Sequence, residues 1–182
     1  MAKRYAPPPD AAWDLVADIF TETRHGGRPR ADDRLMLNGV LCSGAAWRDM
    51  PEGFGPWSTV YQRFRDWRNR ENFEQILKRL HIRLNEQGLI DLETWMIDST
   101  AVRAIRASSG AEKRGPEEPQ DHALGRSRGS LTTKTHMLCD ANGVPLRFLL
   151  SGGQASDIAF AQPLLDEAYI PSLRGRPRKR YR

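Results

Sequence analysis

The chain has 182 residues, of which 28 are Lys or Arg and 23 are Asp or Glu, so its formal net charge is +5. It has no apolar run of the roughly 18 residues that a membrane span needs, no signal-peptide pattern, and only two widely spaced cysteines, Cys42 and Cys139. These features exclude a membrane-spanning chain, a disulfide scaffold and a zinc finger. We expect a soluble, cytoplasmic protein whose basic face binds a polyanion, most commonly nucleic acid; a merely solvated basic surface is the alternative.

The first half of the chain predicts a compact helical domain over residues 1–88. Apolar residues recur there at helical spacing in four stretches. The helices are expected to begin near Asp10, Asp32, Pro56 and Asn72. Asn72 and Gln75 have the spacing of a capping box at the start of the fourth helix.

The third of these helices carries both an aromatic core stripe and a basic face. The stripe consists of Trp57, Val60, Tyr61, Phe64 and Trp67. Arginines lie largely off the stripe, at Arg63, Arg65, Arg68 and Arg70. A helix that buries aromatic residues and offers arginines to phosphates and base edges is typical of a helix-turn-helix DNA reader. The alternative is a helical bundle whose arginines are simply solvated.

The second half predicts strands. Residues 94–99 form a first strand, and residues 131–150 alternate around the turn signal Asp140–Gly143, which predicts a β-hairpin. A helix follows through Leu164. Residues 107–129 have no apolar periodicity and predict a loop, and the basic tail 174–182 predicts disorder.

Asp98 is the residue around which this half is organised. The run Thr94–Thr100 places it on what we expect to be a buried strand, where an unpaired charge costs several kcal/mol. A hydrogen bond from Ser99 or Thr100 would explain it, and so would a divalent metal ion. A strand with a carboxylate, then a hairpin and a helix, is the opening half of an RNase-H-like core, in which two metal ions carry out phosphoryl transfer.

Other polar residues have simpler interpretations. The segment Gly125–Lys134 could cradle a phosphate or be a flexible basic loop, and these two interpretations weigh equally. His81 is expected to be structural, and His136, which alternates away from Met137, is expected to face solvent or DNA. Asp140 is explained by its turn, and Asp157 by the favourable charge at a helix N-terminus.

Several segments, in order, resemble bacterial insertion-sequence transposases of the DDE class, family five. The N-terminal ones are Leu37–Gly39, Ser43–Pro51 and Gly55–Trp57. The later ones are Trp95–Thr100, Gly125–Gly129, Leu131–Lys134 and Ser151–Ala155. The resemblance covers nearly the whole chain and is of the type encoded in two reading frames.

The resemblance implies an α+β chain in three parts. A helix-turn-helix-like DNA-binding domain spans 1–88, the first half of an RNase-H-like catalytic domain spans 89–173, and a basic tail spans 174–182. Asp98 would be the first acid of the D-D-E triad and a ligand of Mg²⁺. The residues expected to bind DNA are Arg48, Arg63, Arg65, Arg68, Arg126, Arg128 and Lys134. The other two acids of the triad would lie beyond Arg182, so we expect an incomplete triad in a first-frame or truncated product.

Three functions remain open at this point. The first is a transposase that binds element ends and target DNA, cleaves with Mg²⁺ and joins strands. The second is a non-catalytic DNA-binding regulator or inhibitor of transposition. The third is a basic RNA-binding protein. The exposed edge of a half-built sheet also predicts self-association, and the family implies a location near the bacterial nucleoid.

Overall fold

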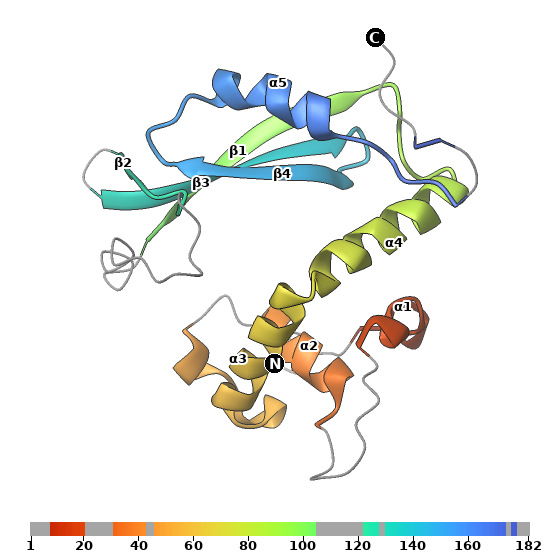
Figure 1. Cartoon of the computed structure of the whole chain (residues 1–182), viewed down its shortest axis with the longest axis vertical. Coiled ribbons are helices and arrows are strands. Elements are labelled where there is room, and N and C mark those ends of the chain that lie inside the picture. Colours follow the sequence, from red (N-terminus) through yellow and green to blue (C-terminus); the bar gives the residue numbers. More distant parts are fainter. Residues whose placement is uncertain are drawn as a thin grey trace. The chain divides into compact units, whose positions relative to one another are not determined.

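A computed structural model describes residues 8–20, 31–42, 46–104, 122–127, 130–173 and 176–177. The chain divides into two compact units, Met1–Leu80 and His81–Arg182. The first unit is helical, and the second is an antiparallel sheet followed by a helix (Figure 1). The predicted α+β class, with helices first and strands after, is confirmed.

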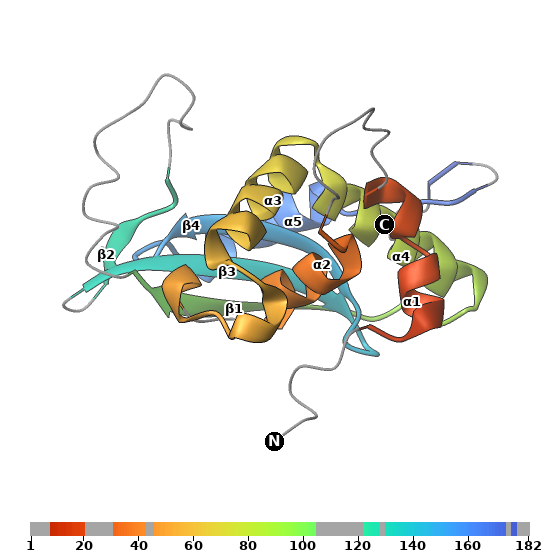
Figure 2. The same ribbon diagram turned by 90° about the horizontal axis from the view of Figure 1, so that it is seen from below.

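The helical unit contains short helices and 3-10 turns. In chain order these are α1 (Asp10–Asp14), η2 (Ala17–Phe20), α2 (Asp33–Cys42), η3 (Trp47–Asp49), η4 (Glu52–Phe54), α3 (Trp57–Asn69) and the first part of α4 (Asn72–Glu86). The first predicted helix therefore ends early and continues as a 3-10 turn. The residues of α4 from His81 onward belong to the second unit. Figure 2 shows α2 and α3 next to each other in this unit, and the two helices are in contact.

Aromatic residues fill the core of the helical unit. Val60 and Trp67 of α3 are completely or almost completely buried, and the ring of Phe20 meets Trp67 edge-on at 4.7 Å between centroids. The predicted stripe is only partly internal, because Trp57 and Tyr61 each remain more than one-third exposed at its N-terminal end. The core therefore forms under the middle and C-terminal turns of α3.

The start of α4 differs from the predicted capping box. The Asn72 side chain is buried and donates a hydrogen bond to the carbonyl oxygen of Ile19, at 3.2 Å. Gln75 donates to the carbonyl oxygen of Arg70 at 3.4 Å. Asn72 thus joins α4 to the end of η2 across the chain instead of capping its own helix, because a buried amide needs a partner and Ile19 supplies it.

The second unit is built on a four-stranded antiparallel sheet. Its elements are β1 (Trp95–Arg103), β2 (Gly125–Ser127), β3 (Ser130–Asp140), β4 (Pro145–Gly152) and α5 (Asp157–Glu167). β3 pairs with β1 on one side and with β4 and the short β2 on the other. The predicted hairpin is confirmed, and Gly143 in its turn has a φ of 80°, which favours glycine.

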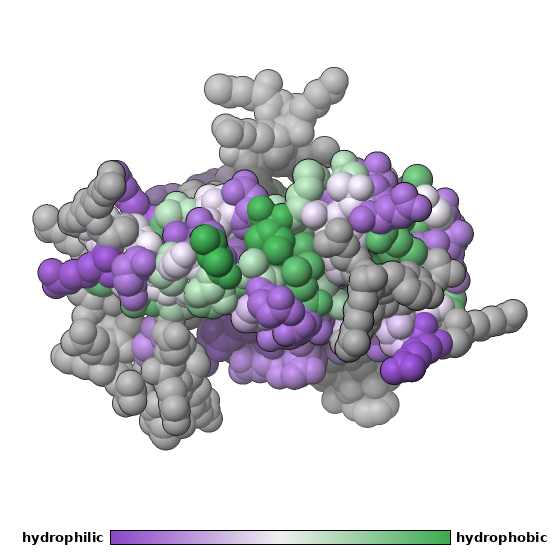
Figure 3. All heavy atoms as spheres, turned by 90° about the horizontal axis from the view of Figure 1, so that it is seen from above, coloured by the Kyte–Doolittle hydropathy of each residue, from purple (hydrophilic) through white to green (hydrophobic). Residues whose placement is uncertain are grey.

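The two faces of the sheet differ. α5 packs on one face, which we call the covered face and which includes Ser99, His136 and Leu138 (Figure 1). His136 and Leu138 are completely buried there. The opposite face, called the open face, carries Asp98 among large apolar side chains that are at least 40% exposed, namely Met96, Val102, Phe148 and Leu150. Figure 3 views the chain from the side of the covered face, over which α5 lies, and apolar residues gather near the centre of the surface seen there.

Asp140 is the buried polar centre of the hairpin. Its carboxylate is completely buried and accepts backbone N–H bonds from Asn142 and Val144 in the turn, at 3.0 and 2.8 Å. It also accepts the N–H of Asp91, at 2.8 Å, which fixes the segment that leads into β1. The prediction that the turn explains Asp140 is confirmed, and the bond from Asp91 adds a long-range role.

Two predictions fall largely outside the described residues. The loop 107–129 is described only at 122–127, and the tail 174–182 only at 176–177. The disorder of the tail therefore remains a prediction.

Candidate functional site

Asp98 is the fourth residue of β1 and lies on the open face. It pairs across the sheet with Met137, and its side chain is exposed, so the expectation of a buried carboxylate is wrong. The reason is that α5 covers only the face to which Ser99 points, and side chains alternate along a strand. The Asp98 carboxylate accepts the backbone N–H of Ser99 at 2.7 Å, which is the simpler of the two explanations given for it.

The described residues supply few metal ligands around this carboxylate. Nowhere in the described ranges do three His, Cys, Asp or Glu side chains come together in a group that could hold a metal ion. Carboxylate oxygens suit Mg²⁺, but the ion needs octahedral coordination and several ligands. Asp98 thus provides one suitable donor, and the described part of the chain falls short of a complete magnesium site.

Behind Asp98, on the covered face, a polar network joins β1, β3 and the first turn of α5. Asp157 lies at its centre, where its Oδ1 accepts hydrogen bonds from the Ser99 hydroxyl at 2.8 Å and from Lys134 Nζ at 3.1 Å. Lys134 also donates to the carbonyl oxygen of Ala155 at 2.9 Å, so it holds the start of α5 against β3. These donors lower the pKa of the Asp157 carboxyl, with the Ser99 bond the largest cause and the Lys134 bond the next.

His136 belongs to this network, and the prediction that it faces solvent or DNA is wrong. Its ring is completely buried and stacks on Phe160 of α5 at 4.2 Å between centroids. Its Nε2 lies 2.8 Å from the Ser151 hydroxyl. Burial lowers the pKa of the imidazole, the positive charge of Lys134 acts in the same direction, and the negative charge of Asp157 opposes both. The side chains of β3 alternate as predicted, but the face of the strand that carries His136 is the one that packs against the core.

The glycine-rich segment before β3 packs closely against the turn after β4. A Cβ on Gly125 would come within 1.5 Å of Gln154 Oε1, and one on Gly153 within 1.7 Å of Thr132 Oγ1. These glycines therefore have a packing role, whichever ligand the segment binds. Arg126 on β2 is exposed, whereas Arg128 lies outside the described residues.

The arginines of the helical unit occupy different environments. Arg65 and Arg68 on α3 are exposed, and Arg68 bonds only weakly to the neighbouring Asn69, at 3.3–3.4 Å. The side chain of Arg63 is only 13% exposed, with Nε 3.8 Å from Asp33 Oδ1. Arg48 is exposed and lies over the Trp57 ring, 5.7 Å from its centroid. Arg48, Arg65 and Arg68 are thus accessible, whereas Lys134 is engaged by Asp157.

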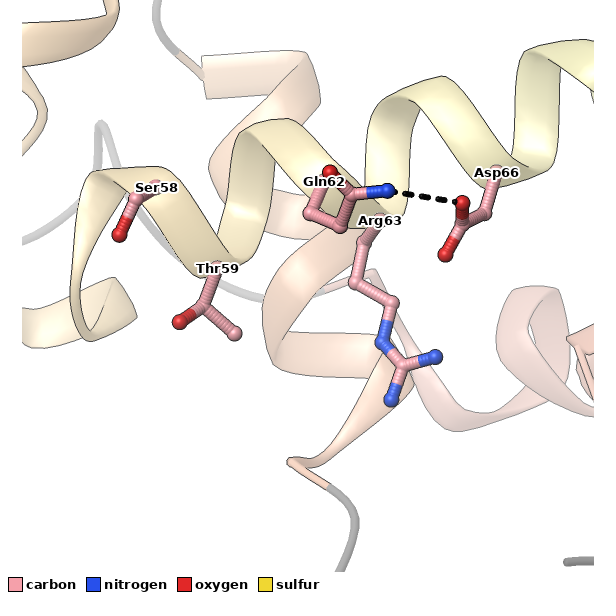
Figure 4. Close-up of a pocket in the computed structure, with 5 residues that line it drawn as sticks. All are labelled: Ser58, Thr59, Gln62, Arg63 and Asp66. Carbon is pink, nitrogen blue, oxygen red and sulfur yellow. Dashed lines mark hydrogen bonds between the residues drawn. The ribbon is translucent and has the colours of Figure 1, made fainter.

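An open depression of about 340 Å³ lies along α3. Its lining consists of Ser58, Thr59, Gln62, Arg63 and Asp66 (Figure 4). Gln62 Nε2 donates to Asp66 Oδ1 at 3.1 Å, and Arg63 projects away from this pair. Ser58 and Thr59 lie four and three residues before Gln62, so the three polar side chains share one face of α3. This spacing is visible in the sequence, but an interpretation based on basic residues alone does not reveal it.

Comparison with known proteins places the helical unit in a family. Residues 9–77 match the family described as "Putative transposase of IS4/5 family (DUF4096)". The chain is 33% identical over 108 residues to "Uncharacterized protein y4sN" of Sinorhizobium fredii, a match that covers 57% of this chain and 82% of that protein.

A second relative carries an insertion-sequence name. It is "Insertion element IS402 uncharacterized 16.2 kDa protein" of Burkholderia cepacia, 28% identical over 108 residues that cover 54% of this chain and 74% of the relative. No solved structure matches the chain. Among the described helices, none is long and apolar enough to cross a membrane. The resemblance stated from the sequence motifs is confirmed, and the chain belongs to the IS4/5 family of insertion-sequence transposases.

Proposed function

We propose that this chain acts in the transposition of an insertion sequence, with the helical unit binding duplex DNA and the sheet unit supplying the first catalytic acid of a DDE transposase. The observation that carries the proposal is the exposed basic side of α3, within the residues matched by the transposase family. In this proposal α2 and α3 form a helix-turn-helix arrangement, and α3 enters the major groove.

Charge and exposure support the DNA-binding part. Arg65 and Arg68 are accessible on α3, and Arg48 lies beside the N-terminal turn of the same helix, where it stacks on Trp57. Arginines at such positions bind phosphates and fix the register of a protein on the duplex. Arg126 on β2 would add a phosphate contact from the second unit, and so would Arg128.

The order of the strands supports the catalytic part. An antiparallel β1–β3–β4 meander followed by α5 agrees with the first half of an RNase-H-like fold. Asp98 is exposed on β1, as a first acid of the D-D-E triad must be. A divalent metal such as Mg²⁺ would need carboxylates in addition to those of the described residues, so Asp98 would be one ligand among several.

A second candidate is a DNA-binding regulator that occupies element ends without cutting them. The observation that favours it is that Asp98 belongs to no group of three potential metal ligands among the described residues. Self-association through the open face, where Phe148 and Leu150 are exposed, would suit either candidate.

Binding of random-sequence duplex DNA, measured over a range of salt concentrations, tests the DNA-binding part. Replacing both Arg65 and Arg68 with Ala should weaken binding and flatten its salt dependence by about 0.9 in slope for each lost phosphate contact. Lys78→Ala removes an exposed charge from α4 and serves as the matched control. Arg63→Ala should have a smaller effect, because its side chain is only 13% exposed. An unchanged slope in the double variant would remove α3 from the interface.

Strand cleavage tests the catalytic part. We expect the 182-residue chain to bind element-end DNA but not to nick or join it in Mg²⁺ or Mn²⁺. Any longer form of the protein that does cleave should lose all measurable activity in Asp98→Ala and Asp98→Asn. Activity that survives Asp98→Ala would remove the catalytic assignment, whereas metal-dependent cleavage by the short chain would show that Asp98 has sufficient partners within it.

A further inference from the structure

The α3 depression contains a side-chain pair that core packing does not explain. Gln62 and Asp66 lie one helical turn apart, and their hydrogen bond is on the solvent side of α3 (Figure 4). The residues that α3 gives to the core are Val60 and Trp67. Ser58 and Thr59 in the first turn are exposed and lie along the same depression.

The bond to Asp66 fixes the orientation of the Gln62 amide. A glutamine amide has two N–H donors and one carbonyl acceptor. Asp66 accepts from one N–H, at 3.1 Å, so the second N–H and the carbonyl oxygen remain available to a ligand in the same plane. Fixing the side chain before binding lowers the entropic cost of binding.

The surroundings of this amide indicate the kind of ligand. The depression is open and is lined by polar and charged residues, unlike the enclosed pockets lined by apolar residues that hold most cofactors. The depression itself contains one acid and one base, Asp66 and Arg63. Arg65 and Arg68 are exposed on the same helix, so the surface of α3 as a whole carries the positive charge that suits a polyanion. In the major groove, adenine presents an N7 acceptor next to an N6 donor, which matches the free donor and acceptor of one glutamine amide.

We propose that Gln62, oriented by Asp66, reads an adenine in the major groove and is a determinant of sequence specificity, with Ser58 and Thr59 contacting the adjacent positions. This inference rests on the proposed DNA-binding function of α3. It separates two roles on one helix: the arginines supply affinity without sequence information, whereas the neutral residues of the depression supply the specificity.

Selection from a duplex library with a randomised core tests the inference, because such a selection reveals the preferred site directly. The parent chain should select a motif that includes adenine. Gln62→Ala should lose the preference at that one position by about fivefold or more, because a bidentate base contact discriminates by about 1–3 kcal/mol. The slope of its salt dependence should not change. Gln62→Arg should shift the preference at the same position from adenine to guanine, which is the usual base partner of a bidentate arginine.

Control variants, together with the Arg65 and Arg68 substitutions, distinguish a failure of this inference from a failure of the proposed DNA binding. Gln75→Ala, an exposed glutamine on α4, should select the parent motif. Asp66→Asn should blur the adenine preference, because the orienting acceptor is weakened. If Gln62→Ala and Gln62→Arg select the parent motif unchanged, the inference fails while DNA binding stands. If the parent chain binds DNA in an arginine-dependent way but selects no motif, the inference also fails. If the parent chain does not bind duplex DNA, the proposed function fails as well.

Discussion

The two units present their polar residues in opposite ways. In the helical unit the core is aromatic, and the polar residues of interest, Gln62 and Arg65, lie outside it on the surface of α3. In the sheet unit the polar network of Ser99, Lys134 and Asp157 lies between the sheet and α5, and the candidate acid Asp98 is on the other side of the same strand. The helical unit thus exposes these polar residues on its surface, whereas the sheet unit uses its polar network to hold β1 against α5.

This difference determines what each kind of substitution can do. Changes to exposed residues of α3, such as Gln62 and Arg65, should leave the fold intact, and under the proposed function their effects should appear in DNA binding. Changes on the covered face of the sheet alter the support of β1, so their effects should appear in stability and local dynamics. Substitutions in each unit can show whether the two units respond separately, and the largest effect is expected from the core side chains.

Removal of a core side chain from each unit should give the largest loss of stability. Trp67→Ala should cost about 3–5 kcal/mol and Leu138→Ala about 2–5 kcal/mol, because both side chains are almost completely buried. If the units unfold separately, Trp67→Ala should lower only the transition of the helical unit and Leu138→Ala only that of the sheet unit, as followed by residue-resolved NMR during heating. An equal shift of a single transition in both variants would show that the units unfold together.

Much of the fold could be predicted from the sequence, because local patterns determine it. The helix starts at Asp10 and Asn72, and the hairpin around Gly143, follow from periodicity and turn chemistry. The choice of the core face of β3 could not be predicted in the same way. Both faces of that strand alternate plausibly, and only α5, which follows later in the chain, decides that His136 is buried.

The polar network was also beyond sequence reasoning. Asp157 looked like an ordinary acid at a helix N-terminus, and its contacts with Ser99 and Lys134 span 58 and 23 residues of chain. The exposure of Asp98 has the same origin. Nothing in its own strand shows which of two adjacent side chains the helix will cover.

The hairpin centre at Asp140 should be the next most sensitive position. Asp140→Ala leaves three part-buried N–H groups without this acceptor, at about 1–3 kcal/mol for each one that water cannot reach. Asp140→Asn should cost less if its carbonyl replaces Oδ1, which accepts from Asn142 and Val144, because only the bond from Asp91 to Oδ2 is then lost. Chemical denaturation measures the ranking, and equal losses for the two variants would contradict it.

Acid should weaken the sheet unit through His136. Burial lowers the pKa of the folded imidazole below the ordinary value of about 6.5, so the unfolded chain takes up the proton first as the pH falls. The stability from the neutral ring is fully present above pH about 6.5 and is lost as the pH falls toward the lowered pKa. The groups facing the ring are Lys134, Ser151, Asp157 and Phe160. His136→Gln should flatten the pH dependence of the sheet unit's unfolding midpoint below about pH 6.5, although it lowers the midpoint itself. An unchanged slope would show that another group titrates.

The smallest and most local effect should come from Asp157. Its side chain is more than half exposed, so solvent screens its ion pair with Lys134, and overall stability should change little in Asp157→Asn. The amide oxygen introduced by Asp157→Asn would still accept but carries no charge, so the junction of β1 and α5 should loosen, because the Ser99 hydroxyl and Lys134 Nζ both donate to this one oxygen. We expect faster amide hydrogen exchange in the first turn of α5 and around Ser99 in β1, with the helical unit unaffected. Ser99→Ala should increase exchange at the same amides, and the double variant should exceed neither single variant by much, since both substitutions act on the Ser99–Asp157 bond. Asp166→Asn, a change on the same helix where Gln162 is a hydrogen-bond partner, is the control. If Asp157→Asn leaves exchange at these amides unchanged, or speeds it equally across the whole sheet, the network does not act as a local support for the strand that carries Asp98.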